Sequence, residues 1–277
     1  MVKRIYVQLL ATISYNANLV GFVRGTIFRG DIKGLCVPGL NCSSCPGAVG
    51  ACPLGSLQGA LGDVRFKLPL YIVGVLLLFG VLLGRAICAF LCPFGLVQEL
   101  LHKIPSPKLP KNKATRWLSL SKYVILLIFV IYLPLHFLVA SGTSVPAFCK
   151  YLCPAGTLQA GIPLVLANES LRAVTGALFR WRIFWLGAIL ISGIFVYRVF
   201  CRFLCPLGAI YSLFNKFALF GIQVNEHRCT KCRACVKSCK LDVHKINDRE
   251  CIRCGDCRPK CAKGAIVYRR KDEKHES

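Results

Sequence analysis

The sequence predicts an all-α polytopic membrane domain of four transmembrane helices, followed by a small α+β domain that is rich in cysteine. Hydrophobic residues make up 55% of the 277 residues and charged residues 17%, whereas soluble domains carry about 25% charged residues. Four stretches lack charged side chains for long enough to cross, or nearly cross, about 30 Å of hydrocarbon. The composition excludes a disordered chain and argues against an ordinary soluble enzyme. We therefore divide the chain into a membrane domain, residues 1–221, and a C-terminal domain, residues 222–277.

The four expected spans differ in quality. They are residues 5–23, 68–84, 123–140 and 183–197. The first is the least apolar, because it contains Gln8, Thr12 and Asn16. The fourth is short, but Arg182 and Arg198 bound it, and their side chains are long enough to reach the two interfaces.

Positive charge is divided unequally between the two sides of such a membrane domain. Residues 85–122 carry seven Lys and Arg residues, residues 198–277 carry eighteen, and two more precede the first span. Residues 24–67 and 141–182, on the other side, carry nine together. The positive-inside rule therefore predicts a multi-pass protein of the cell (inner) membrane with both termini in the cytoplasm. Because this topology accounts for the formal net charge of +24, we expect membrane lipid and no nucleic acid as a partner.

A four-residue motif, Cys-Pro-x-Gly, follows each expected span. Its cysteines are Cys52, Cys92, Cys153 and Cys205, and another cysteine precedes each of them, namely Cys45, Cys88, Cys149 and Cys201. Proline is favoured at the first position of a helix, so each motif places its cysteine at a helix start. The positive end of the helix dipole stabilises a thiolate there, and an anionic cluster bound to it. Each motif therefore offers two thiolates at a break between helices.

Pairs of motifs are needed to complete an iron–sulfur site, because a [4Fe–4S] cluster takes four cysteines. The alternation of the spans places the second and fourth motifs at the cytoplasmic end and the first and third at the outer end, which gives two same-direction repeats. This pairing predicts an inner cluster on Cys88, Cys92, Cys201 and Cys205. It predicts an outer cluster on Cys45, Cys52, Cys149 and Cys153.

The outer side has two further cysteines, so its ligand set is open. Cys36 and Cys42 remain as alternative outer ligands or as a disulfide. A second arrangement leaves Cys149 and Cys153 as the spare pair and builds one local cluster on Cys36, Cys42, Cys45 and Cys52. In a third arrangement, Cys42 and Cys45 form a redox-active dithiol.

Two cysteine runs of identical spacing define the C-terminal domain. The pattern Cys-x2-Cys-x2-Cys-x3-Cys occurs at Cys229, Cys232, Cys235 and Cys239, and again at Cys251, Cys254, Cys257 and Cys261. The domain resembles the bacterial two-cluster ferredoxins, in which the fourth cysteine of each run binds the other cluster. The resemblance implies one cluster on Cys229, Cys232, Cys235 and Cys261, and a second on Cys251, Cys254, Cys257 and Cys239. Lys240 and Ala262 stand where that family usually has proline.

Over nearly its whole length the chain resembles a family of membrane polyferredoxins. It is similar to the membrane quinol-dehydrogenase subunit of periplasmic nitrate reductase and to the membrane part of the nitrous-oxide reductase maturation protein. The resemblance rests on the Cys-x3-Cys-Pro motifs at 88–93 and 201–206, on the four spans and on the C-terminal cysteine runs. The chain departs from these relatives by a third such motif at 149–154 and by the cysteine-rich stretch 36–46.

These observations predict an electron-transport protein or an oxidoreductase subunit, rather than a stand-alone enzyme with catalytic residues of its own. About four [4Fe–4S] clusters would carry electrons from a low-potential cytoplasmic donor to an extracytoplasmic acceptor. Residues 198–277 hold eighteen Lys and Arg residues against eight acids, which suits an acidic ferredoxin or flavodoxin as donor. The alternative is a quinol or quinone oxidoreductase membrane subunit, with the quinone near the inner cluster. A redox sensor ranks last, because a sensor needs one labile cluster rather than a series.

Overall fold

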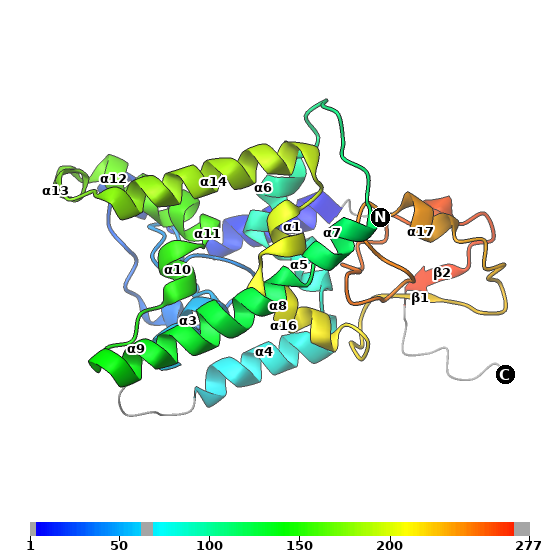
Figure 1. The fold of residues 1–277 in the computed structure, drawn as a ribbon, viewed down its shortest axis with the longest axis horizontal. Helices are drawn as coiled ribbons and strands as arrows, with labels where there is room; N and C mark the ends of the chain where they lie inside the picture. Colours follow the sequence, from blue (N-terminus) through cyan, green and yellow to red (C-terminus); the bar gives the residue numbers. More distant parts are fainter. Residues whose placement is uncertain (1–3, 62–68, 269–277) are drawn as a thin grey trace.

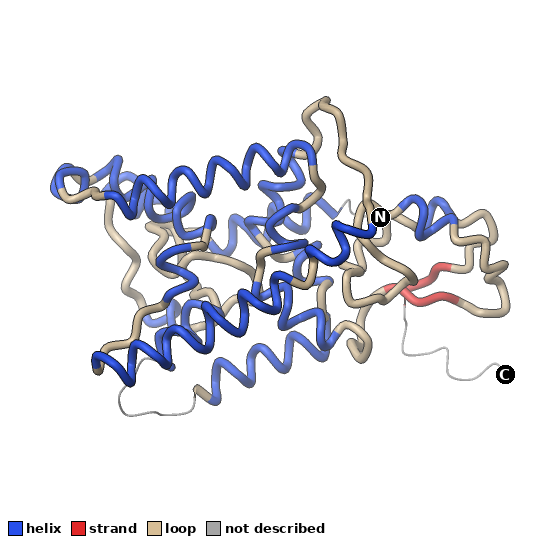
Figure 2. The backbone as a smooth tube through the Cα atoms, in the orientation of Figure 1, coloured by secondary structure: helices blue, strands red, loops and turns tan. Residues whose placement is uncertain are grey.

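The computed structural model describes residues 4–61 and 69–268. Within these residues the chain is mostly helical, and two short strands form the one sheet. Figure 1 shows an elongated helical bundle with the strands β1 and β2 at one end and α9, α12 and α13 toward the other. Figure 2 shows that helix runs throughout the bundle, whereas strand is confined to the C-terminal end.

Two helices in the first half of the bundle begin within a cysteine motif. The elements of this half are α1 Arg4–Tyr15, α2 Leu19–Arg24, the 3-10 turn η1 Asp31–Gly34, α3 Pro53–Leu61, α4 Leu70–Leu83, α5 Ala86–Phe90 and α6 Pro93–Leu101. α3 and α6 begin at the proline of a Cys-Pro-x-Gly motif, because proline has its φ fixed near the helical value and needs no hydrogen-bond acceptor there. α4 ends at Leu83, because the following Gly84 has a positive φ of 53° that departs from the helical backbone.

The second half contains two π-helical segments, each of which ends shortly before a proline. The bounds are α7 Lys113–Leu118, α8 Ser121–Ile125, the π-helix η2 Leu126–Tyr132, α9 Leu133–Ser141, α10 Ala147–Tyr151, α11 Pro154–Gly156, the π-helix η3 Thr157–Gly161, α12 Ile162–Ala167, α13 Glu169–Ala173, α14 Ala177–Phe195, α15 Val199–Phe203 and α16 Pro206–Phe214. Pro134 and Pro163 lie two residues beyond η2 and η3. A proline ring clashes with the carbonyl four residues earlier and donates no hydrogen bond, and the wider π turn accommodates both effects.

Two helices in the described part of the chain are long and apolar enough to cross a membrane. They are α14 and the continuous helix Lys113–Ser141, which joins α7, α8, η2 and α9. α4 and the helix Pro154–Ala167 are apolar but shorter. The predicted span 123–140 lies within the long helix Lys113–Ser141, and the span 183–197 overlaps α14. The span 68–84 overlaps α4, but its first residue lies outside the described residues.

The predicted first span, residues 5–23, is not one continuous helix. A break at residues 16–18 separates α1 from α2. The Asn18 side chain lies in this break and donates to the Pro46 carbonyl at 2.9 Å. The backbone N–H of Asn18 also leaves the helical pattern and donates to the Gly47 carbonyl at 3.1 Å, so the apolar pattern alone overestimated the length of the helix.

Residues 222–268, called the tail below, lie against one end of the bundle. The tail contains β1 Ile222–Val224, α17 Ala234–Ser238, the 3-10 turn η4 Arg258–Lys260 and β2 Ile266–Tyr268. β1 and β2 pair in antiparallel register, with Ile222 opposite Tyr268. The predicted C-terminal domain therefore contains both helix and strand.

Buried hydrogen bonds join the tail to α16 and the loop that follows it. Arg253 is 4% exposed and donates to the backbone carbonyls of Asn215 and Ala218. The Asn215 side chain donates in turn to the carbonyls of Asp248, at 2.6 Å, and Cys251, at 2.9 Å. Each of these groups would lose a buried partner if the tail moved away, so the contact fixes the tail to the bundle.

Candidate metal centres

Two cavities in the tail are lined by cysteines from both runs. One has a volume of about 380 Å³, and its cysteines are Cys229, Cys232, Cys235 and Cys261. The cysteines of the other are Cys235, Cys239, Cys251, Cys254 and Cys257. Tyr197, which follows α14 in the bundle, also lines the second cavity. The structure thus brings together both sets of cysteines that the resemblance to two-cluster ferredoxins implies.

The two cysteine runs share one backbone shape. Lys231 and Arg253 occupy the same position in the two runs and have φ angles of 55° and 54°. Two residues later, Arg233 and Gly255 have φ angles of 59° and 81°. Non-glycine residues rarely adopt such left-handed conformations, and they occur where successive backbone N–H groups form an anion-binding concavity. The repeated shape fits a run that holds an anionic group.

The four predicted inner cysteines lie in the core of the bundle. Cys88 and Cys92 flank the α5–α6 break, Cys201 and Cys205 flank the α15–α16 break, and each is 4–6% exposed. The Gln98 side chain of α6 joins the two halves here, because its Nε2 donates to Cys201 Sγ at 3.1 Å. The Gly208 N–H donates to Cys205 Sγ at 3.4 Å at the start of α16, as expected of a thiolate at the positive end of a helix.

Buried cations outnumber carboxylates beside these four cysteines. Arg85 and Lys122, whose side chains are 1% and 0% exposed, share the single carboxylate of Glu250. Arg198, with a side chain 1% exposed, donates to the Cys88 carbonyl. It also pairs with Glu99, a carboxylate that it shares with Arg4. A buried cation without a counter-charge is costly, whereas a [4Fe–4S] cluster bound by four thiolates is an anion. The charge distribution therefore fits a cluster at the inner site.

Glu250 is the carboxylate that connects the tail to this group of cations. Burial raises the pKa of Glu250, but Arg85 and Lys122 lower it more, and the net pKa lies below its usual value. Glu250 is therefore ionised at neutral pH, and it directly precedes Cys251 in the chain.

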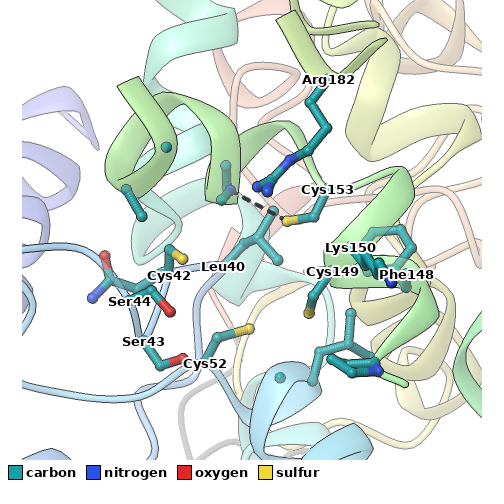
Figure 3. A pocket seen from close by; sticks show the side chains of 18 of the residues that line it. Leu40, Cys42, Ser43, Ser44, Cys52, Phe148, Cys149, Lys150, Cys153 and Arg182 are labelled. Carbon is teal, nitrogen blue, oxygen red and sulfur yellow. Dashed lines mark hydrogen bonds between the residues drawn. The ribbon is translucent and has the colours of Figure 1, made fainter. Parts of the chain in front are cut away.

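Four cysteines also border a cavity of about 350 Å³ at the opposite end of the bundle. Figure 3 shows the sulfur atoms of Cys42, Cys52, Cys149 and Cys153 around one space. Arg182 of α14 lines the same cavity, and its Nε donates to Thr157 Oγ1 at 3.2 Å. None of the ion pairs among the described residues includes Arg182, so its positive charge is available to an anion in the cavity.

The glycine of the motif keeps this cavity open. A β-carbon added at Gly156 would lie 3.7 Å from Cys42 Sγ and 3.8 Å from Cys153 Sγ, and one at Gly55 would lie 3.8 Å from Cys149 Sγ. A side chain at either position would therefore extend among the sulfur atoms. Within the described residues, no three His, Cys, Asp or Glu side chains converge on a site for a single metal ion. Four cysteines around a space of this size suit a cluster instead.

The outer set differs from the predicted one in a single residue. Cys42 borders the cavity, and Cys45 does not. Cys45 is 1% exposed, and its thiol lies 3.6 Å from Asn16 Oδ1. The N–H of Cys45 donates to the Cys42 carbonyl at 3.0 Å, whereas Gln159 Oε1 accepts the N–H of Cys42 at 2.8 Å. The tight turn directs the two thiols to different surroundings, and Gln159 holds Cys42 at the cavity.

Cys36 also lies outside the outer cavity. Its N–H donates to the Tyr71 hydroxyl at 3.1 Å, and its backbone pairs with Ala51 in an isolated parallel bridge. All the cysteines of the described residues are free thiols, so the alternative of a disulfide between Cys36 and Cys42 is not formed there. The structure likewise does not gather the local set of four cysteines between residues 36 and 52 around one space.

Two kinds of site residue were missed by sequence analysis. The buried cations Arg85 and Lys122 carried no signal, because charged residues next to an apolar stretch are usually solvated. Glutamines were overlooked although their pattern is visible in the sequence. The first three motifs extend to Cys-Pro-x-Gly-x-x-Gln, which ends at Gln58, Gln98 and Gln159.

The 4Fe-4S binding domain family matches four segments of the chain, residues 50–71, 68–112, 123–166 and 177–224. The chain belongs to this family. Each matched segment contains one Cys-Pro-x-Gly motif, so the family match covers the four inner cysteines and three that border the outer cavity, Cys52, Cys149 and Cys153. The predicted iron–sulfur chemistry is thereby confirmed for the family.

Curated relatives extend the similarity over most of the chain. An uncharacterized protein from Methanocaldococcus jannaschii is 30% identical over 222 residues, which are 76% of this chain and 81% of the relative. The regulatory protein NosR from Stutzerimonas stutzeri is 28% identical over 63% of this chain but only 23% of its own length. The putative electron transport protein YccM from Escherichia coli is 27% identical over 73% of this chain and 54% of the relative. No solved structure matches the chain. The predicted resemblance to ferredoxin-type iron–sulfur proteins is confirmed.

Proposed function

We propose that the chain transports electrons across a membrane, from the side of the tail to the side of the outer cysteines, by means of four [4Fe–4S] clusters. When bound, the clusters supply one-electron transfer. One contact carries the proposal, because Arg85 spans the space between the inner site and the tail. Its Nη2 donates to the Cys201 carbonyl at 3.3 Å, and its Nη1 donates to Glu250 Oε2 at 2.7 Å. Glu250 adjoins Cys251, so a single side chain connects two neighbouring cysteine sites.

The chain's own residues would hold four clusters at successive positions along the bundle and tail. The tail ligands would be Cys229, Cys232, Cys235 and Cys261 for one cluster and Cys239, Cys251, Cys254 and Cys257 for the other. The inner ligands would be Cys88, Cys92, Cys201 and Cys205. The outer ligands would be Cys42, Cys52, Cys149 and Cys153. The cavities support the tail and outer assignments, and the burial of all four inner cysteines supports the inner one. The outer cavity supports Cys42 in place of the predicted Cys45.

The membrane arrangement is part of the same proposal. The bundle, residues 1–221, would cross the cell (inner) membrane in four passes as two same-direction repeats, with both termini and the tail in the cytoplasm. Two long apolar helices support a membrane location. One family match for each cysteine motif supports the repeat. The distribution of Lys and Arg supports the orientation.

The surface of the tail suits an acidic electron donor such as a ferredoxin or flavodoxin. Basic side chains surround the cavity that Cys229 lines. They are Arg228, Lys231, Arg233, Lys245 and Lys263. Clustered positive charge steers an acidic partner to this cavity, and added salt would weaken the attraction.

An apolar cavity favours a second candidate function, that of a quinone oxidoreductase subunit. The cavity has a volume of about 390 Å³ and lies beside α5, the helix that carries Cys88. It is lined by Val7, Leu83, Ala86, Ile87, Phe90, Leu91, Phe220, Gly221, Arg253 and Tyr268. A mainly apolar lining with a few polar groups at one side is typical of sites for ring-shaped hydrophobic ligands.

Transport across liposomes tests the proposed function. Protein would be reconstituted into sealed vesicles that contain a membrane-impermeant electron acceptor, and reduced ferredoxin would be added outside. Vesicles with the tail outward should reduce the internal acceptor in the absence of quinone. A strict requirement for added quinone would favour the second candidate. No reduction under either condition would contradict both.

Cluster number and pairing can be checked by iron analysis. Protein purified anaerobically should carry about 16 Fe per chain, because four clusters hold four iron ions each. Cys92→Ser and Cys205→Ser exchange one cysteine from each half of the bundle, and each should lower the iron content to about 12. Electron paramagnetic resonance should show that both variants lose the same cluster and keep the tail signals. Loss of different clusters would show that the pairing across the halves is wrong, and about 8 Fe in the unaltered protein would leave only the tail clusters.

A further inference from the structure

Two buried glutamines make the same set of contacts. One follows the first Cys-Pro-x-Gly motif, and the other follows the second. Gln58 lies in α3 and Gln98 in α6, each six residues after the cysteine of its motif, and both are 0% exposed. Figure 1 shows α3 and α6 well separated in the bundle. Two side chains at equivalent positions of separate helices therefore repeat one arrangement.

Each amide group reaches a cysteine from the second half of the chain. Gln58 Nε2 donates to Cys149 Sγ at 3.4 Å, and Gln98 Nε2 donates to Cys201 Sγ at 3.1 Å. Both cysteines are the first of their pair, so the contact joins motif one to motif three and motif two to motif four. These are the pairs of motifs that border the outer and inner sites.

The carbonyl end of each amide fixes the backbone next to the same cysteine. Gln58 Oε1 accepts the N–H of Phe148 at 3.1 Å, and Gln98 Oε1 accepts the N–H of Phe200 at 2.9 Å. Phe148 and Phe200 are 0% exposed and directly precede Cys149 and Cys201. One glutamine thus aims the cysteine through the backbone and donates to its sulfur. Both contacts of Gln98 are buried, whereas the sulfur contact of Gln58 is part-buried at the edge of the outer cavity.

A donor to a cluster sulfur has a consequence beyond packing. Reduction adds negative charge to a cluster and its thiolates, and an N–H directed at the sulfur stabilises that charge. The effect is larger in a buried site than in water, because the local dielectric constant is low. Tying the helices together would require only the carbonyl contact, so the sulfur contact calls for a separate explanation.

We propose that Gln58 and Gln98 are positioning residues that set the reduction potentials of the outer and inner clusters, each through its amide hydrogen bond to the thiolate of Cys149 or Cys201. The inference rests on the proposed function for the presence of clusters, but it concerns their potentials rather than the direction of transport.

Gln159 provides a matched control. It occupies the same position in the third motif, and its Oε1 accepts the N–H of Cys42 at 2.8 Å. No hydrogen bond from its amide nitrogen to a sulfur occurs within the described residues. Gln159 therefore has the backbone contact of the other two glutamines without the sulfur contact.

The test is a potentiometric titration of the purified anaerobic protein, followed by electron paramagnetic resonance, with iron content measured on the same samples. Gln98→Met keeps the length of the side chain but removes the donor. It should lower the equilibrium constant for one-electron reduction of the inner cluster about tenfold. This change corresponds to a reduction potential that is lower by about 59 mV. Gln58→Met should do the same for the outer cluster. Gln159→Met removes a backbone contact at the outer site but no donor to a sulfur of the inner site, so it should leave the potential of the inner cluster unchanged.

A second variant at the same position distinguishes tuning from packing. Gln98→Glu keeps an acceptor for the Phe200 N–H while replacing the amide donor with a carboxylate, so it should also lower the potential of the inner cluster. Unchanged potentials in both Gln98 variants at full iron content would overturn the proposal. Loss of the inner cluster in both variants would assign Gln98 a purely structural role and overturn it as well. Failure of transport in liposomes with the expected shifts in potential would reject the proposed function and leave this inference standing.

Discussion

Glu250→Gln is expected to weaken the attachment of the tail to the bundle by about 3–5 kcal/mol, because it removes the carboxylate that two buried cations share. Glu250 accepts from Arg85 at 2.7 Å and from Lys122 at 2.5 Å, and the cations' side chains are 1% and 0% exposed. A glutamine carbonyl can accept from one cation, but the amide N–H groups then face the other. Both positive charges would remain buried without an anionic partner on the tail.

Hydrogen exchange of the backbone amides measures this loss directly. In Glu250→Gln, amides in residues 241–252 of the tail should exchange roughly a hundredfold faster or more, because the tail separates from the bundle more often. Asp256→Asn is the control, since it also removes one carboxylate from the tail. Asp256 is 58% exposed and lies 3.7 Å from Arg4, so its loss should change stability by less than about 1 kcal/mol. Equal exchange in the two variants would show that the contact with Arg85 and Lys122 does not hold the tail.

Another buried cation near the inner cysteines, Arg198, has surroundings that the sequence did not predict. Arg198 bounds an apolar stretch, and the sequence therefore predicts a side chain that reaches the membrane interface. The structure instead buries Arg198 completely, with hydrogen bonds to the Cys88 carbonyl and to Glu99. Hydropathy describes how apolar a segment is, but it carries no information about an anionic site on the neighbouring helix. The partners of a buried charge become visible only when distant segments are brought together.

Regular spacing made other parts of the site predictable. The two tail runs repeat one pattern, and the structure gives them one backbone shape with left-handed residues at matching positions. The inner cysteines also come from two motifs of equal spacing, each with its second cysteine at a helix start. In these parts local geometry fixes many of the thiols, because a tight loop positions the tail cysteines and a helix start positions the second cysteine of each inner motif.

The outer set was harder to predict, because its cysteines lie in an irregular segment. Residues 36–52 offer four cysteines, and no helix period relates them. The position of Cys42 depends on Gln159, which is 117 residues away in the chain, and the position of Cys45 depends on Asn16, which is 29 residues away. Contacts between such distant residues cannot be inferred from the spacing of cysteines. The sequence therefore offered no reason to choose Cys42 rather than Cys45 as the outer ligand.

Cys42→Ser should remove the outer cluster, whereas Cys45→Ser should leave it in place. The iron content of anaerobically purified protein is expected to fall from about 16 to about 12 Fe per chain in the first variant and to stay at about 16 in the second. Cys42 borders the outer cavity with Cys52, Cys149 and Cys153, and a serine hydroxyl is a poor substitute for a thiolate ligand. At Cys45, a serine hydroxyl can keep the hydrogen bond to Asn16.

Differential alkylation of the same variants locates the ligands without relying on iron alone. In the unaltered protein, Cys42 should resist alkylation until the iron is removed by a chelator, because a thiolate bound to iron is not free to react. Cys36 is half-buried outside the cavity and should label in the native protein, and Cys36→Ser should retain all its iron.

The opposite pattern, with iron lost in Cys45→Ser and kept in Cys42→Ser, would restore the set predicted from the sequence. It would mean that the turn between these two cysteines inverts when the cluster is inserted. Full iron in both variants would require a serine or water ligand, or a cluster built on other residues, and would remove the basis for assigning this cavity to the outer cluster.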